Sequence, residues 1–514
     1  MSPRAGGAVP CPPLIYYLDP VAAGPVGNWG PHLARARDMG FSHVGVAPVF
    51  APRPGGSLFL ADDFERAAAF LGAGDSADAA ACKIAALAND FGLQVVLDIV
   101  INQVARDGAM TRSAPGWFHQ DEKPVLDPRH LPAPIDAASA RFDDPACAAQ
   151  IRTWWVDRLV RLARVGAASF RLIGLENAPA DFLRQLLREV RLQEEDCSFF
   201  GWTPGVSWPR LADLERVKLD GVFASTAWWD GRASWFVEEH NALRRIAPVL
   251  SVVEAPFGER LASQTHGRDL HAAYRRALSI ALCTGHGLFV PMGFEDGARD
   301  RMRDRIENDA HTNTEPAIDL REDIRSANAL AARLSSFGSR GEIRRLSDVE
   351  EVVSVHLIAD ASDVRTAERG LVLLVNTDSH QVRPVTAHLD PLAAAAGGAF
   401  GAPQTIDGAE LSAPLDPDAT RLLSVTRTQP VRERSLRNAR AATNIGIGAR
   451  IAIEHVTPCI DDGAFAVKRI VGRSISVEDD RIPNGHQSVP VARTVDKRHP
   501  EGQLNGRMSG KRFQ

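Results

Sequence analysis

Short apolar runs and longer amphipathic segments alternate from residue 14 to about residue 345. Continuous apolar runs are typical of parallel strands that are buried on both faces, and their alternation with helices indicates a parallel sheet. The pattern therefore predicts an α/β protein with a (β/α)8 barrel over residues 14–345. The apolar runs are Leu14–Leu18, His43–Ala47, Gln94–Ile99, Ala168–Leu172, Ser198–Trp202, Gly221–Ala224, Val249–Val253 and Gly287–Val290. The main amphipathic stretches are Ala77–Phe91, Ala146–Val165, Ala180–Leu192 and Leu270–Cys283.

The pattern changes beyond the barrel. Strand-like runs separated by Gly, Pro and Asp turns predict an antiparallel β-sandwich over residues 346–428, with strands at Val352–Leu357, Gly370–Asn376 and Ala419–Val425. Residues 1–13 are rich in Pro and Gly and predict a flexible arm, and residues 429–446 predict a linker. Residues 447–514 predict only part of a second β segment, because its later half is polar.

Composition narrows the classes of function. The hydrophobic share is 45% and the net charge is −5, so neither nucleic acid nor an anionic membrane is an expected partner. The six cysteines form no CxxC pair and no apolar run approaches about 20 residues, so we expect a cytoplasmic protein without a membrane span. No GxGxxG, P-loop, HExxH or GxSxG motif occurs, and we expect no metal and no cofactor.

Three of the predicted barrel strands carry informative residues near their ends. Residues 97–103 read LDIVINQ, residues 170–173 read FRLI, and residues 290–295 read VPMGFE. These stretches, in this order and spacing, resemble glycoside hydrolase family 13, the α-amylase superfamily. The resemblance covers some 330 residues and implies the (β/α)8 fold. A long excursion at residues 104–145 should then lie over the C-terminal mouth of the barrel.

The resemblance also locates three catalytic acids of the family, and none is present here. The nucleophile position, two residues after Arg171, is Ile173, which shares the inward face of its strand with that arginine. The acid/base position is Trp202, and the third acid position is Phe257. Retaining glycosyl transfer needs two carboxylates, so the resemblance implies a scaffold without the family's chemistry.

Other polar residues remain near the predicted mouth. Glu176 and Glu254 are fallback carboxylates, but a shift of three residues moves a carboxyl by more than catalysis tolerates. Asp98 and Asn102 are either a sugar-binding remnant or a brace for the turn after the third strand. Arg171 and Trp202 are further candidates for sugar contact. The charge of Arg171 needs a buried partner, and Asp98 is the natural one.

A second resemblance lies near the C-terminus. Residues 449–458 read ARIAIEHVTP and residues 463–472 read GAFAVKRIVG. Together they are similar to the opening of the α-1,4-glucan:maltose-1-phosphate maltosyltransferases, whose catalytic barrel lies further downstream. The resemblance implies that residues 447–514 are the truncated start of such a domain.

Three hypotheses for function follow. The first is a catalytically degenerate α-amylase-type module in α-glucan (glycogen) metabolism, which binds or scaffolds. The second is an active glucan glycosyltransferase or hydrolase that uses displaced carboxylates, and the third is a purely structural assembly domain. An α-glucan or maltose-type saccharide, a second copy of the chain or a maltosyltransferase are the partners to consider.

Limited proteolysis tests the expected organisation. A partial sheet buries too little apolar area to offset an ordering entropy of about 1–2 kcal/mol per residue. We expect cleavage between about residue 429 and the C-terminus, leaving a stable core of barrel and β domain. Protection of residues 447–514 at protease levels that nick the barrel loops would contradict this expectation.

Overall fold

The computed structural model describes residues 12–120, 127, 129, 136–265, 269–305, 316–334, 341–348, 350–364, 366–385, 400–406, 411, 413–428, 451–457, 475–483 and 489–495. The chain divides into two compact units, Met1–Pro430 and Val431–Gln514. Residues 1–11 of the predicted arm and all of the predicted linker at 429–446 lie outside the described residues.

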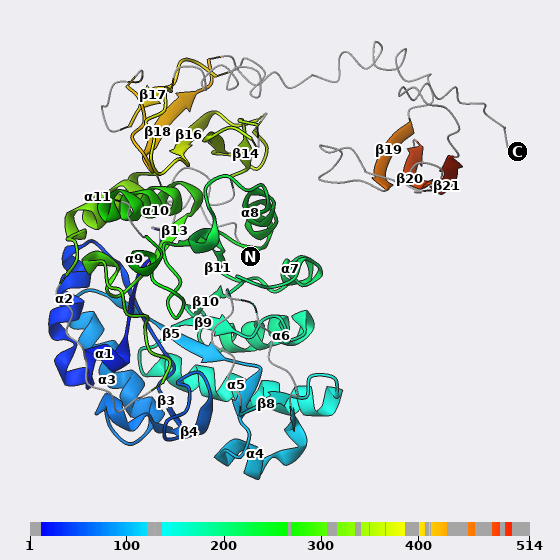
Figure 1. Cartoon of the computed structure of the whole chain (residues 1–514). Coiled ribbons are helices and arrows are strands. Elements are labelled where there is room, and N and C mark those ends of the chain that lie inside the picture. The colour runs from blue at the N-terminus through cyan, green and yellow to red at the C-terminus, as the bar shows by residue number, and fades with distance from the viewer. Residues whose placement is uncertain are drawn as a thin grey trace, which may run out of the picture. The chain divides into compact units, whose positions relative to one another are not determined.

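A closed barrel of parallel strands is the centre of the first unit (Figure 1). Its strands follow one another in the order β1-β2-β5-β9-β10-β11-β12-β13, and β13 pairs with β1 to close it. They are β1 (Leu14–Leu18), β2 (His43–Val46), β5 (Gln94–Val100), β9 (Ser169–Ile173), β10 (Ser198–Gly201), β11 (Gly221–Ala224), β12 (Val249–Val252) and β13 (Gly287–Pro291). Each lies within two residues of a predicted apolar run, so the predicted barrel is confirmed.

Helices surround the barrel, and several begin at a side chain that caps them. Asp144 accepts hydrogen bonds from the amides of Ala146 and Cys147 at the start of α5, and Ser76 does so for Ala79 at the start of α3. The described helices are α1 (Pro20–Ala23), α2 (Gly30–Asp38), α3 (Ala77–Asp90), α4 (Ala109–Ser113), α5 (Pro145–Arg164), α6 (Ala180–Arg191), α7 (Trp208–Leu214), α8 (Trp235–Ile246), α9 (Leu261–Gln264), α10 (Leu270–Thr284) and α11 (Arg321–Leu334).

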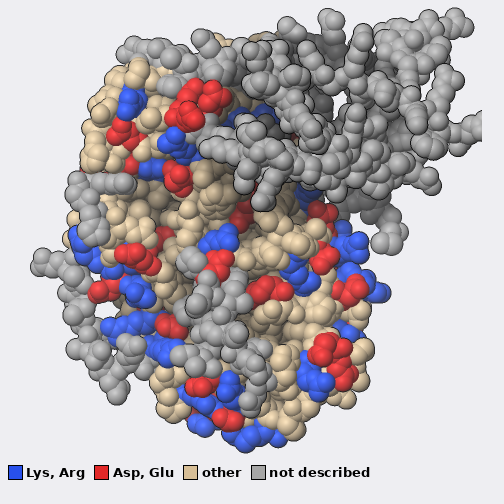
Figure 2. Space-filling view, turned by 45° about the vertical axis from the view of Figure 1, so that its right-hand side comes forward, with Lys and Arg blue, Asp and Glu red and all other residues tan. Residues whose placement is uncertain are grey.

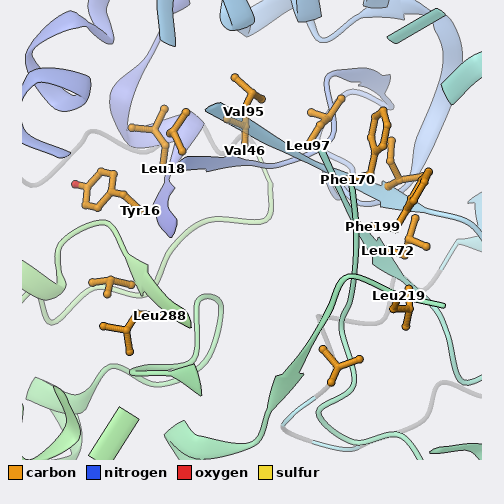
Figure 3. Packing of buried hydrophobic residues seen from close by; sticks show 14 of the residues in the cluster. Tyr16, Leu18, Val46, Val95, Leu97, Phe170, Leu172, Phe199, Leu219 and Leu288 are labelled. Atoms are coloured by element: carbon orange, nitrogen blue, oxygen red, sulfur yellow. The ribbon is translucent and has the colours of Figure 1, made fainter. Parts of the chain in front are cut away.

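Alternation along the strands separates two cores. Outward side chains such as Leu97, Phe170, Leu172 and Phe199 pack between strands and helices, as Figure 3 shows. Inward side chains form a second cluster inside the barrel. Two excursions add small sheets, β3 (Phe50–Pro52) with β4 (Ala61–Ala67), and β6 (Gln103–Ala105) and β7 (Phe118–Gln120) on either side of β8 (Ala137–Ala140).

An antiparallel sheet follows the barrel, as predicted, in the order β14-β15-β16-β18-β17. Its strands are β14 (Ile343–Arg345), β15 (Val353–Ala359), β16 (Arg369–Asn376), β17 (Gln404–Thr405) and β18 (Thr420–Thr426). Leu371, Leu373 and Val375 on one face of β16 join the apolar cluster of the barrel helices, whereas Val372 and Leu374 on the other face join a core of the β domain itself. The sheet is therefore anchored to the barrel by one face.

The second unit contains an antiparallel sheet of β19 (Ile451–Thr457), β20 (Ile475–Pro483) and β21 (Val489–Val495). The predicted run at Ala449–Val456 corresponds to β19. The run predicted at Phe465–Val471 lies outside the described residues. The strands β20 and β21 were not predicted, because charged residues such as those at 478–481 interrupt their apolar pattern.

The contact between barrel and β domain centres on the carbonyl of Gly231. Ser354 Oγ and His356 Nε2 both donate to it, the latter at 3.0 Å. The His356 ring meets Trp229 edge-on, with centroids 4.9 Å apart. Nearby, Arg276 and Asp418 form an ion pair of 2.6 Å. Burial lowers the pKa of His356 to about 4, so its ring is neutral near pH 7.

We expect the stability advantage of the wild-type chain over His356→Gln to shrink as the pH falls. The folded pKa of about 4 lies below the ordinary value of 6.5, so the neutral ring contributes stability that is present above pH 6.5 and lost toward pH 4. The difference between the two free energies of unfolding should fall by about 1.4 kcal/mol per pH unit. Urea unfolding across this range measures it. The exposed His380→Gln is the control, and a constant difference for His356→Gln would contradict the prediction.

Candidate functional site

The interior of the barrel contains a buried ion pair between β5 and β9. Asp98 and Arg171 are register partners on these strands. Arg171 Nε donates to Asp98 Oδ1 at 2.7 Å and its Nη2 to Oδ2 at 2.5 Å, and both side chains are 1% exposed. Tyr17 of β1 donates its hydroxyl to Oδ2 at 2.7 Å. Burial raises the pKa of Asp98, and the charge of Arg171 opposes that shift. The pairing predicted from the sequence is confirmed.

Aromatic rings enclose the guanidinium of Arg171. Its central carbon lies 4.5 Å from the ring centroid of Tyr17, 4.8 Å from that of Phe289 and 4.9 Å from that of Trp202. Its Nη1 is buried without a hydrogen-bond acceptor, so the ring faces are its surroundings on that side. Cation–π attraction of this kind is worth more when the ion is desolvated. The carboxylate and the rings together compensate a charge that has left water.

The residues at the three expected acid positions lie in one apolar cluster. Ile173 is 8% exposed, Trp202 3% and Phe257 8%. Phe257 packs edge-on against Tyr17 and Phe59, with centroids 6.0 and 5.0 Å apart. Trp202 donates its indole N–H to the carbonyl of Arg129 at 3.3 Å. This hydrogen bond connects the excursion after β5 to the mouth of the barrel, where the excursion was expected to lie. Side chains therefore fill the space around these positions.

The remaining predicted site residues also have protein contacts. Asn102 is 3% exposed and lies against Gly174, where a Cβ would come within 1.9 Å of Asn102 Oδ1. Gly174 has φ +86°, a conformation that favours glycine. Asn102 is thus packed against the turn after β9. Asp98, Arg171 and Trp202 lie together inside the barrel, whereas Asn102 is buried at the turn after β9. None of the four lies on an open surface.

Glu254 has partners on the loop that follows it and on α10, where Tyr274 donates its hydroxyl to Oε1 at 3.5 Å. Its Oε2 lies 3.0 Å from Arg260 Nη2, and its Oε1 accepts from the amide of Leu261 at 2.6 Å. Both charged side chains are almost fully buried, at 2% and 1% exposed. Burial raises the pKa of Glu254, and Arg260 opposes that shift. Glu176, by contrast, is half-buried in the loop after β9.

Two further carboxylates are buried with partners, Glu295 at the end of the VPMGFE stretch and Glu239, which the sequence analysis does not single out. Glu295 accepts from the Tyr16 hydroxyl at 2.6 Å and from Arg35 at 3.2 Å. Glu239 of α8 accepts from the amide and hydroxyl of Ser225 at 2.9 and 2.7 Å. The signal available for Glu239 was its place on the apolar face of an amphipathic helix, where an unpaired carboxylate would be costly.

Acidic and basic side chains are interspersed over the face of the chain seen in Figure 2. Among the described residues, no group of three His, Cys, Asp or Glu side chains could hold a metal ion. No helix in the described part of the chain has the length and apolarity needed to cross a bilayer.

Comparison with known proteins agrees with this geometry. The sequence pattern of the family "Alpha-1,4-glucan:maltose-1-phosphate maltosyltransferase, domain N/S" matches residues 449–512. The α-amylase of Geobacillus thermoleovorans in complex with acarbose superposes with a TM-score of 0.60 at 15% identity, over 81% of this chain and 98% of that chain. A mutant isomaltulose synthase of Erwinia rhapontici in complex with sucrose gives 0.60 at 11% identity, over 80% and 98%. The first unit therefore has the fold of these solved structures, and residues 449–512 are similar to domain N/S of the maltosyltransferases.

A full-length relative shows the same combination. The α-1,4-glucan:maltose-1-phosphate maltosyltransferase of Burkholderia pseudomallei is 32% identical over 507 residues, which cover 93% of this chain and 44% of that protein. The match extends far beyond residues 449–512, so this relative also contains a counterpart of the α-amylase-type barrel. The chain spans less than half the length of this curated relative.

The contribution of the Asp98–Arg171 ion pair to the stability of the barrel can be measured. Arg171→Ala leaves Asp98 buried without a counter-ion, so we expect the free energy of unfolding to fall by about 3–5 kcal/mol. Adding Asp98→Ala should restore part of the loss, because both charges are then absent. Urea denaturation of the single and double variants measures both effects. Arg184→Ala, which breaks an exposed pair with Asp181, should cost less than about 1 kcal/mol. An unchanged midpoint for Arg171→Ala would contradict the prediction.

Proposed function

We propose that the barrel is a non-catalytic α-amylase-type module that binds or positions α-glucan for a maltosyltransferase-like protein. One observation carries the proposal. The positions where the family places its three acids are occupied by Ile173, Trp202 and Phe257, which pack into a single buried apolar cluster. An isoleucine cannot attack an anomeric carbon, and neither an indole nor a phenyl ring can exchange the required proton.

The carboxylates that remain in the barrel support this proposal. Asp98 is neutralised by Arg171, Glu254 by Arg260, and Glu295 is bound by Tyr16 and Arg35. Retaining glycosyl transfer needs two carboxyl groups about 5 Å apart, with the substrate between them. Carboxylates held in such ion pairs and hydrogen bonds are poorly placed to act on a sugar.

An active enzyme that uses Glu176 and Glu254 is the main alternative. Glu254 is 3% exposed, paired with Arg260 and hydrogen-bonded by the amide of Leu261, so it would have to leave these contacts before it could meet a substrate. Glu176 is more accessible, but a single carboxylate covers only half of the reaction. The geometry favours the non-catalytic function.

The relatives support the substrate class. The Burkholderia pseudomallei protein is named for α-1,4-glucan and maltose 1-phosphate, and we infer a place in glycogen metabolism from that name. We also propose a cytoplasmic protein, in keeping with the free thiols of Cys82, Cys147, Cys197 and Cys283. Association with a maltosyltransferase, or with a second copy of this chain, belongs to the same proposal.

Turnover tests the proposal directly. The purified chain should release no phosphate from maltose 1-phosphate in the presence of glycogen, and no reducing sugar from starch, above a heat-inactivated sample. Loss of both a nucleophile and a proton donor typically costs several orders of magnitude. Glu176→Gln and Glu254→Gln should give the same background. A rate in the wild-type chain that Glu176→Gln abolishes would establish the active alternative instead.

A further inference from the structure

A groove lies on the outside of the barrel between α7 and α8, which are neighbours in Figure 1. It has a volume of about 390 Å³. Because both helices follow barrel strands, they run in the same direction and each contributes one side-chain stripe. Trp208, Leu211, Ala212 and Glu215 of the α7 side face Glu238, Asn241, Ala242 and Arg245 of α8.

Trp208 is the unusual residue of this groove. It is 52% exposed, whereas Trp29, Trp155, Trp202 and Trp229 are buried. Only two other large apolar side chains in the described ranges are comparably exposed, Leu192 and Val382, and neither lines the groove. An indole that stands in water at the edge of a hollow, with the buried Leu211 beside it, offers an open apolar ring face.

The polar side chains of the groove are available to a ligand. Glu215, Glu238 and Arg245 are exposed, and none makes a side-chain hydrogen bond or ion pair within the described part of the chain. Asn241 differs, because its amide donates to the carbonyl of Ile343 at 2.8 Å and its oxygen accepts from Arg244 at 2.8 Å. Asn241 therefore has its hydrogen-bonding groups satisfied by the protein, whereas the charged groups of Glu215, Glu238 and Arg245 face solvent.

We propose that this groove binds a short stretch of α-glucan, with Trp208 as its stacking platform. The C–H face of a glucose ring packs on an indole, while its hydroxyl groups donate to the carboxylates of Glu215 and Glu238 and accept from Arg245. The two signs of charge suit a neutral polyhydroxyl ligand better than an anion or a cation. The volume lies in the range of small-ligand sites, about 300–1,000 Å³.

The choice of an α-glucan as the ligand rests on the proposed function. The location of the groove does not, because it lies on the outer helices and not in the packed interior of the barrel. A groove on the outer helices needs no carboxylate at the mouth. It therefore reconciles glucan binding with the burial of Ile173, Trp202 and Phe257.

Affinity electrophoresis of the full chain in gels with and without glycogen tests the groove. The wild-type chain should be retarded, and Trp208→Ala should weaken the retardation about tenfold in apparent Kd, with Trp208→Phe between the two. Leu192→Ala removes another exposed apolar side chain, which does not line the groove, and should bind as the wild type. Circular dichroism of each variant monitors folding. Glu238→Ala, on the opposite wall, is an independent variant that should also weaken binding.

Fluorescence titration with maltotriose reports on the same site. Binding should change the emission of the wild-type chain, and this change should be lost in Trp208→Ala. If the wild type and Trp208→Ala bind glycogen equally, the groove is not the glucan site, while the proposed function stands. If the wild type binds no glucan, both the groove as a glucan site and the proposed glucan-binding function are refuted. If Trp208→Ala alters the oligomeric state and glucan retards neither protein, the groove is a protein interface and the saccharide site is refuted.

Discussion

The barrel depends on how it accommodates one positive charge at its centre. Arg171 is 1% exposed, and an isolated guanidinium could not remain there. Asp98 neutralises it from the neighbouring strand, Tyr17 binds the second carboxylate oxygen, and the rings of Trp202 and Phe289 cover the rest of the cation. The strands β1, β5, β9 and β13 are linked through these contacts. The interior of the barrel is therefore a packed core with a buried ion pair at its centre. The apolar side chains of the inner cluster surround this pair.

Much of this fold could be predicted from the sequence, because a strand buried on both faces reads as an uninterrupted apolar run. The predicted runs at Leu14–Leu18 and Gly221–Ala224 coincide with β1 and β11. The small strands of the excursions could not be found in this way. The strand β4, for example, reads ADDFERA, and its charged residues are at least partly exposed and interrupt the apolar pattern. The strand β20 of the second unit reads ISVEDDRIP, whose charges interrupt the apolar pattern in the same way. Pairing with a neighbouring strand defines them, and pairing is not visible in composition.

The interior pair of Asp98 and Arg171 could also be predicted, since alternation places Arg171 inward and a buried cation requires an anion. The pairs of Tyr16 with Glu295 and of Glu254 with Arg260 could not be predicted from the sequence. The first joins residues 279 positions apart, which only the closure of β13 onto β1 brings together. The second depends on the course of a loop, and the turn between residues 254 and 261 has no periodicity to read. The aromatic enclosure of Arg171 likewise combines the rings of Tyr17, Trp202 and Phe289, which come from three separate strands or strand ends.

The packing of Ile173, Trp202 and Phe257 has an evolutionary consequence. A carboxylate introduced at any one of these positions would enter an apolar cluster in which the nearby cation, Arg171, already has its counter-ion. Such a step costs stability at once, and it brings no reactivity until its companions arrive. Steps toward the apolar cluster meet no such barrier, because each one removes a buried charge. Substitution at these positions is therefore asymmetric in its cost, and acidic side chains are disfavoured once the apolar cluster is packed.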